Sequence, residues 1–110
     1  MIARVWRGWT RLDDADQYEH LLRERVIPRL RKIAGHRSAQ LLRLNRELEA
    51  EFIVVNYFDS LAAVREFAGE DYTTPVFEPE ARRLLVRLEP KAEHYDVRLA
   101  AGEIGEPRRD

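Results

Sequence analysis

Hydrophobic and polar residues follow two different periods along this chain, and the changes of period divide it into strands and helices. Ile2 to Thr10 mixes β-branched and aromatic residues with arginine in alternation, which predicts a first strand. After Asp13, a residue that caps helices, apolar side chains recur every three or four positions until Gly35, which predicts an amphipathic helix. Pro28 interrupts this pattern, and its ring predicts a kink or a break in the helix.

A hairpin and a second helix follow in the pattern. His36 to Arg46 and Glu51 to Phe58 are two extended runs on either side of the charged segment Glu47-Leu48-Glu49, which predicts a β-hairpin. The pair Asp59-Ser60 then caps a helix whose apolar residues keep a helical spacing until Gly69.

The last third of the chain begins with an irregular stretch over 70–79 that contains two prolines and predicts a loop, a place where function is often found. A helical pattern resumes over 80–88, and residues 92–99 alternate as a final strand. The order β-α-β-β-α-β predicts an α+β, ferredoxin-like domain with an antiparallel sheet over 1–99. Residues 100–110 form a polar C-terminal tail with two glycines and a proline.

One strand of this arrangement carries a surplus of apolar residues. Phe52 to Phe58 is apolar on both parities, as expected of a strand that is covered on both faces. The helices of a ferredoxin-like domain cover one face only. The other face therefore needs a cover from outside the chain, and the sheet of a second copy predicts a homodimer.

Composition narrows the function classes. With 19 basic and 20 acidic residues among 110, the net charge of -1 provides no general attraction to nucleic acid or to anionic lipid. The chain has no cysteine, which excludes disulfides, thiolate catalysis and cysteine-ligated metals. No apolar run approaches the roughly 20 residues that span a bilayer, so the expectation is a cytoplasmic protein without a membrane partner. Signatures of hydrolase triads, dinucleotide sites and nucleoside triphosphate sites are missing.

Three short segments carry a likeness to a known family: Ile2 to Gly8, Phe67 to Asp71 and Glu93 to Val97. Over residues 1–99 the chain resembles the antibiotic biosynthesis monooxygenase domain family of the dimeric α+β barrel superfamily. The resemblance implies a dimeric α/β barrel with a pocket between the sheet and the helices. Relatives in this family include cofactor-independent monooxygenases of aromatic polyketides, quinol monooxygenases and haem-degrading enzymes.

The residues that mark the haem-degrading branch are missing from this sequence. The resemblance implies an Asn on the first strand, a Trp at the end of the third and a later His. The first strand has no Asn, the third ends in Asn56-Tyr57-Phe58, and Ala81 falls near the expected His. The polyketide branch is not matched at its spacing either. The resemblance therefore disfavours haem degradation and predicts no cofactor, while a haem or flavin held by shape alone stays open.

His94 is the candidate catalytic residue, because a neutral imidazole can take a proton from a phenol or hydroquinone and leave an anion that reacts with O₂. The alternative is a histidine that only bonds to a neighbour. His20 and His36 are expected at the surface. No histidine pair has the spacing of a metal motif, so no metal site is predicted.

Four further residues are candidates for substrate binding. Arg4 and Trp6 share one parity of the first strand, where Trp6 would stack on a flat ligand and Arg4 would hold a carbonyl or carboxylate; both fit a dimer interface equally well. Asn56 would orient a ligand carbonyl or satisfy backbone groups. Tyr72, in the irregular loop, would close over a ligand or lie exposed.

Two functions stay in competition at this point. The first is a cofactor-independent monooxygenase that oxidises a small aromatic, phenolic or quinol substrate with O₂. The second is a non-catalytic dimeric barrel that binds a small hydrophobic ligand or serves as an interaction module. A pocket filled by Trp6, Phe58 and Phe77 would leave no room for a substrate and would favour the second.

Overall fold

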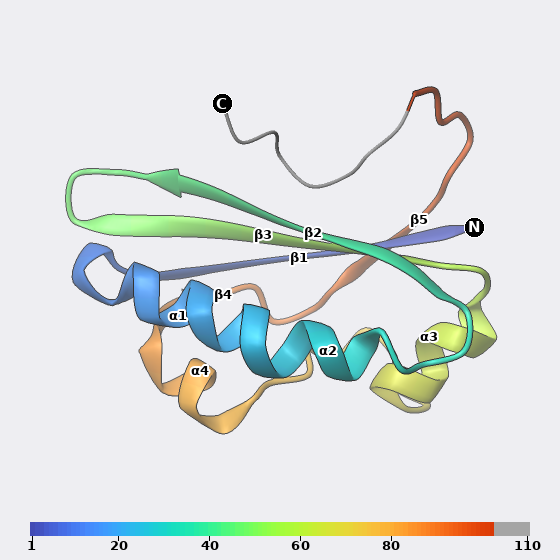
Figure 1. The fold of residues 1–110 in the computed structure, drawn as a ribbon, viewed down its shortest axis with the longest axis horizontal. Helices are drawn as coiled ribbons and strands as arrows, with labels where there is room; N and C mark the ends of the chain where they lie inside the picture. Colours follow the sequence, from blue (N-terminus) through green and yellow to red (C-terminus); the bar gives the residue numbers. More distant parts are fainter. Residues whose placement is uncertain (103–110) are drawn as a thin grey trace.

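The structure is a computed structural model that describes residues 1–102, and it contains one antiparallel sheet with its helices on a single face (Figure 1). The strands are β1 (Ile2–Arg11), β2 (His36–Asn45), β3 (Glu49–Phe58), β4 (Leu85–Leu88) and β5 (Glu93–Asp96). The helices are α1 (Ala15–Leu21), α2 (Ile27–Leu30), α3 (Leu61–Ala68) and α4 (Pro79–Leu84). Among the described residues, no helix is long and apolar enough to cross a membrane.

The predicted α+β, ferredoxin-like fold is confirmed by the strand order β2-β3-β1-β4, in which β5 also pairs with β1. Strand β1 pairs with β3 along its whole length, from Ile2 opposite Phe58 to Arg11 opposite Glu49. The two strands at the centre are therefore the first and the third, as the apolar composition of the third predicts. Of the predicted tail over 100–110, residues 103–110 lie outside the described part of the chain.

The helix predicted over 80–88 is wrong in its second half. Helix α4 ends at Leu84, and Leu85–Leu88 forms β4, which pairs with β1 at Gly8 to Thr10. The leucine spacing suits a helix and a strand equally well, and the open edge of β1 decides between them because its backbone groups need hydrogen-bond partners. The last strand of the fold is thus split into β4 and β5, both on the edge of β1.

The first helical region is interrupted just before Pro28, as predicted. A turn of π-helix (Leu22–Val26) separates α1 from α2, and Pro28 lies in the first turn of α2. Proline has no N–H and its ring crowds the preceding turn, and the wider π turn provides the space that the ring needs. Leu22 and Val26 of this turn both face the sheet side that carries the core.

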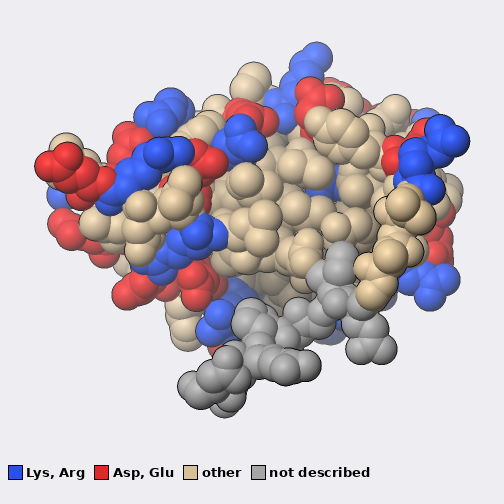
Figure 2. All heavy atoms as spheres, turned by 90° about the horizontal axis from the view of Figure 1, so that it is seen from above, with Lys and Arg blue, Asp and Glu red and all other residues tan. Residues whose placement is uncertain are grey.

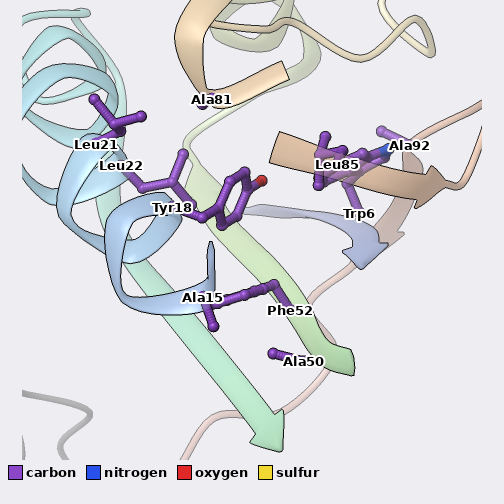
Figure 3. Close-up of a cluster of buried hydrophobic side chains, with 10 residues drawn as sticks. All are labelled: Trp6, Ala15, Tyr18, Leu21, Leu22, Ala50, Phe52, Ala81, Leu85 and Ala92. Atoms are coloured by element: carbon purple, nitrogen blue, oxygen red, sulfur yellow. The ribbon is translucent and has the colours of Figure 1, made fainter. Parts of the chain in front are cut away.

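The core lies between the sheet and the helices in two clusters. The larger cluster joins α1, α4, β1, β3 and β4, and Figure 3 shows the aromatic rings of Tyr18 and Trp6 directed into the space between the helices and the sheet. The smaller cluster is built on Phe58, Leu30 and Val64, beneath α2 and α3. Residues of β1 and β3 that face this side alternate with residues that face away from the helices.

Gly8 provides the first test, because the ring of Trp6 occupies the space where a side chain would begin. A Cβ at Gly8 would lie 2.6 Å from Trp6 Cη2 and 3.0 Å from Leu85 Cδ2. Replacing a glycine by alanine ordinarily raises the free energy of unfolding by about 0.4–1 kcal/mol, because alanine reduces the conformational entropy of the unfolded chain. We expect Gly8→Ala instead to lower the free energy of unfolding by about 1–3 kcal/mol in urea denaturation, because of overpacking.

The matched control for this substitution is the same change in a Trp6→Phe background. Phenylalanine lacks the ring atom that the new Cβ meets, so Gly8→Ala should cost less there than in the wild type. An equal cost in both backgrounds would contradict the close approach of Trp6 to the strand.

Candidate functional site

A cavity opens between the central strands and the helices, and it combines an apolar wall with a few polar side chains. The cavity is small, with a volume of about 50 Å³. Its walls come from β1, β3, α1, α2, α3, α4, the π turn and the loop before α4; the lining residues are Arg4, Trp6, Tyr18, Leu22, Val26, Leu30, Val54, Asn56, Phe67, Pro75, Val76, Phe77, Glu78 and Ala81.

Arg4 is the central polar group of this cavity. It lies on β1, is only 4% exposed, and has no carboxylate within 4 Å among residues 1–102. Its Nη1 donates to the carbonyl of Tyr72, its Nη2 donates to the carbonyl of Thr74 at 3.0 Å, and its guanidinium stacks on the ring of Phe67 at 5.4 Å. Burial lowers the pKa of Arg4 to about 10, which still leaves it charged at neutral pH.

His94 lies behind Arg4 and does not line the cavity. It is opposite Arg4 in the β1–β5 register, and its Nε2 is 3.1 Å from Arg4 Nη1. Because a guanidinium only donates, Nε2 accepts this hydrogen bond and Nδ1 carries the ring proton. Burial, with the nearby charge of Arg4, lowers the pKa of His94. The lone pair that a catalytic base would use is therefore already committed to Arg4.

Tyr72 also lies outside the cavity wall. Its ring meets the edge of His94 with the centroids 5.1 Å apart, and Arg65 stacks over it at 5.3 Å. Its contribution to the site is the backbone carbonyl that accepts from Arg4. The loop after α3 is thus tied to the cavity by its backbone and not by a side chain.

Asn56 reaches the cavity from β3, directly opposite Arg4 in the β1–β3 register. Its Oδ1 lies 3.0 Å from His36 Nε2, and Arg31 Nη1 lies 3.3 Å from His36 Nδ1. Since Arg31 can only donate, His36 Nδ1 accepts and Nε2–H donates to Asn56. This chain of hydrogen bonds fixes the amide orientation, so that Asn56 offers its NH₂ group to the cavity.

The expectation that His36 is a surface residue is wrong. It is buried, and its ring packs edge-on against Phe58 at 5.2 Å. Burial lowers its pKa, the bond to Asn56 opposes this shift, and Arg31 adds to it. The sequence did contain a signal, because Asn56 in an apolar strand requires a buried partner, and hairpin pairing brings the start of β2 beside the end of β3. His20 is exposed, as predicted.

Trp6 forms part of the cavity wall and not of the outer sheet face. Its Nε1 donates to the carbonyl of Glu89 at 2.8 Å, and its ring meets Phe77 edge-on at 5.6 Å. The ring is therefore held at both ends. Trp6, Phe58 and Phe77 are the three aromatic residues whose side chains could have filled the pocket. Phe58 lies in the smaller core cluster, whereas Trp6 and Phe77 form part of the cavity wall.

Two polar residues of the wall were not singled out by the sequence. Glu78 is buried and caps α4 by accepting from the backbone N–H of Ala81 at 2.9 Å, and its other oxygen lies 3.4 Å from Arg25. The backbone hydrogen bond, above all, lowers the pKa of Glu78. Tyr18 is buried in the wall, and burial raises the pKa of its phenol. A helical stripe predicts that Tyr18 is buried, but it does not predict that the hydroxyl reaches a cavity.

Comparison with solved structures places this architecture among the antibiotic biosynthesis monooxygenases. A protein of Bacillus cereus assigned to that family matches with a TM-score of 0.63 at 12% identity, over 93% of this chain and 97% of that chain. A similarly assigned protein of Deinococcus radiodurans matches with a TM-score of 0.67 at 14% identity, over 96% and 100%.

The third match is the haem-degrading protein MhuD of Mycobacterium tuberculosis, solved with two haems in its active site. Its TM-score is 0.62 at 16% identity, over 93% of this chain and 100% of that chain. No protein-family profile and no curated protein sequence matches the chain. The chain thus has the fold of the antibiotic biosynthesis monooxygenases, and identities this low extend the likeness to the fold alone.

The residues around the cavity do not suit a haem. Within residues 1–102 no histidine and no methionine lines the cavity, and His36 and His94 each accept a hydrogen bond from an arginine. Tyr18 is the one phenol in the lining, and its raised pKa keeps it protonated. Among residues 1–102 no group of three or more histidine, aspartate or glutamate side chains is arranged to hold a metal ion.

The two buried histidines predict a dependence of stability on pH. Because the pKa of each is lowered in the folded protein, the unfolded chain binds more protons as pH falls below the ordinary value of about 6.5. Their contribution to stability is complete above that pH and decreases below it, toward the folded pKa values. Urea denaturation at about pH 7.5 and about pH 5.5 should show the smaller free energy of unfolding at the lower pH.

Substitutions distinguish the contribution of the histidines to this pH dependence from the contribution of carboxylates. We expect His36→Gln and His94→Gln each to reduce the difference between the two pH values. His20→Gln, at an exposed position, should leave the wild-type difference unchanged. A difference that none of the three variants alters would show that neither buried ring resists protonation.

Proposed function

We propose that the cavity around Arg4 is the site of a cofactor-independent oxygenation of a small phenol or quinol by O₂. The observation that carries this proposal is a buried guanidinium that lines a largely apolar cavity and has no carboxylate partner among residues 1–102. Such a group stabilises negative charge on a ligand far more than an arginine in water does. The fold shared with antibiotic biosynthesis monooxygenases supports the same reaction class.

In the proposed reaction, the flat ring of the substrate lies against Trp6 and Phe77 with a hydroxyl directed at Arg4. The guanidinium lowers the pKa of that hydroxyl, and the proton leaves to water at the mouth of the cavity. The resulting anion passes electrons to O₂. For a quinol, one oxygen atom enters the ring, the other leaves as water, and the product is a hydroxylated quinone, so that the substrate supplies all the electrons.

His94 acts in this proposal through Arg4 and not as the base. Its Nε2 accepts from Arg4 Nη1 and thereby fixes the plane of the guanidinium. Glu78 is also a poor base, because its two oxygens are taken by Arg25 and by the backbone N–H of Ala81. Arg4 is therefore the residue that touches the substrate, and His94 is a positioning residue.

The same observation supports the rival function, a barrel that binds a small hydrophobic ligand without turnover. Among the described residues, no histidine lines the wall, and its carboxylate, Glu78, is engaged by Arg25 and by the backbone N–H of Ala81. A binding protein needs none. The two functions share the cavity and its cation, and they differ only in whether O₂ is consumed.

The proposal includes a homodimer formed through the face of the sheet that the helices leave open. On this face β1, β2, β3 and β5 present apolar side chains at positions opposite in parity to Arg4 and Asn56; they are Val5, Leu42, Ile53, Val55, Tyr57 and Tyr95. Figure 2 shows this face with uncharged residues at its centre and charged residues gathered toward both ends. A second copy of the same face would cover the centre of each sheet.

Oxygen consumption tests the reaction. An oxygen electrode should record enzyme-dependent uptake with small quinols and hydroanthraquinones above the rate of heat-denatured protein. Arg4→Met should lower kcat/KM by about 10²-fold or more, because it removes the group that stabilises the developing charge. Arg11→Met, at the exposed end of the same strand, is the matched control and should retain the wild-type rate.

His94 variants tell a positioning residue from a base in the same assay. Glutamine can still accept a hydrogen bond from Arg4, whereas alanine cannot, so His94→Gln should keep most of the activity that His94→Ala loses. Equal loss in both variants would assign the base to His94. No oxygen uptake with any quinol, with the fold intact, would favour the binding protein.

The oligomeric state tests the assembly. Native mass spectrometry should give a dimer, and Val55→Asp, at the centre of the open face, should give a monomer because it places a charge in the apolar contact. Leu48→Asp, at the exposed hairpin tip, should remain a dimer. A wild-type monomer at micromolar concentration would contradict the proposed interface.

A further inference from the structure

The polar side chains of the cavity that remain available to a ligand can each donate a hydrogen bond. A guanidinium carries five N–H bonds, and in the described part of the chain three of those of Arg4 are taken, by the carbonyls of Tyr72 and Thr74 and by His94 Nε2. Two N–H bonds of Arg4 are left for a ligand. They belong to a full positive charge that has no carboxylate of residues 1–102 within 4 Å.

Two further donors border the same space. Asn56, whose Oδ1 is held by His36, is left with its NH₂ group, and it is the cross-strand neighbour of Arg4 on the cavity face. Tyr18 also lines the cavity, and Figure 3 shows its hydroxyl directed away from α1 toward the sheet. Its raised pKa keeps the proton that it would donate.

The carboxylate and amide oxygens of the wall side chains are occupied. The carboxylate of Glu78 is engaged by Arg25 and by the N-terminus of α4, and the carbonyl of Glu89 accepts from Trp6. A ligand that brings its own donors would therefore find no free side-chain carboxylate there. A ligand that brings acceptors would find donor groups on Arg4, Asn56 and Tyr18.

We infer that the cavity selects flat apolar ligands that carry one negatively charged oxygen group, over neutral ligands of the same shape. Arg4 would bind the charged oxygen through two parallel N–H bonds, and the rings of Trp6 and Phe77 would border the apolar body. The inference rests on the proposed function for the identity of the site, and it extends to a ligand that is bound without turnover. The charged oxygen can belong to a carboxylate or to an ionised phenol.

Binding of a matched pair of probes tests the selectivity. Isothermal titration calorimetry with 2-naphthoate and 2-naphthamide compares the same ring with and without the charge. Wild-type protein should bind 2-naphthoate at least about tenfold more tightly, the order of a charge-assisted contact to a buried group. Arg4→Met should bring the two dissociation constants together, and Arg11→Met should preserve the wild-type ratio.

Wild-type protein alone can overturn the inference, whatever the folding of the variant. Equal affinity for both probes, a preference for the amide, or no binding of 2-naphthoate at millimolar concentration would each do so. Titration with 4-nitrophenol above and below its own pKa identifies the source of the charge: tighter binding of the ionised form extends the site to phenols, and no change restricts it to carboxylates.

Neither probe is a phenol or quinol, so the binding experiment and the oxygen-uptake experiment test the two proposals independently. If 2-naphthoate binds selectively but quinols cause no oxygen uptake, the inferred anion selectivity is supported and the proposed reaction is contradicted. If neutral quinols cause oxygen uptake but the two naphthalene probes bind with equal affinity, the inferred anion selectivity is contradicted and the proposed reaction is supported.

Discussion

The rest of this site depends on one constraint, a buried guanidinium that has no carboxylate beside it in the part of the chain that the structure describes. Burying an unpaired charge is costly, and the chain offsets this by placing carbonyls and a neutral imidazole around Arg4. Those carbonyls come from the loop after α3, so the position of that loop is set by the charge. The pairing of β5 with β1 brings His94 to the same point.

Burial and the arrangement of charge also explain why two histidines are neutral at opposite ends of the site. Burial is the main cause that lowers the pKa of each ring, and the neighbouring arginine, Arg4 at His94 and Arg31 at His36, adds to this shift. One ring holds the cation in place and the other orients the Asn56 amide. The histidines therefore lie behind the cavity wall, and Arg4, Asn56 and Tyr18 are polar residues that line the cavity.

Much of the fold could be predicted from the sequence, because each segment has a local pattern that agrees with its place in the sheet. The break before Pro28 and the central position of the third strand followed from proline geometry and from residues that are apolar on both parities. The end of α4 did not follow, since Leu84, Leu85 and Leu88 fit a helix and only the distant edge of β1 makes Leu85–Leu88 a strand. Sequence spacing contains no information on such a non-local hydrogen-bond demand.

The site was predictable in part for the same reason. Shared parity on β1 placed Arg4 and Trp6 together, and Asn56 stood out as a polar residue in an apolar strand. His94 was selected for its chemistry, but its lone pair is occupied by an arginine 90 positions away, which no local pattern reveals. His36 was assigned to a turn because it follows Gly35, and its burial depends on a cross-strand partner. Partners of buried polar groups are set by tertiary contacts, so residue type alone does not identify them.

Side-chain ¹⁵N NMR of the arginines measures the central claim most directly. A guanidinium fixed by two carbonyls and an imidazole should show separate, slowly exchanging Nη–H resonances for Arg4, unlike the averaged signals of the exposed Arg11. Added benzoate should shift the Arg4 resonances and leave those of Arg11 in place. The account would be contradicted if the Arg4 signal is averaged, exchanges as fast as that of Arg11 and does not shift with benzoate, because Arg4 would then be neither held in place nor accessible to an anion.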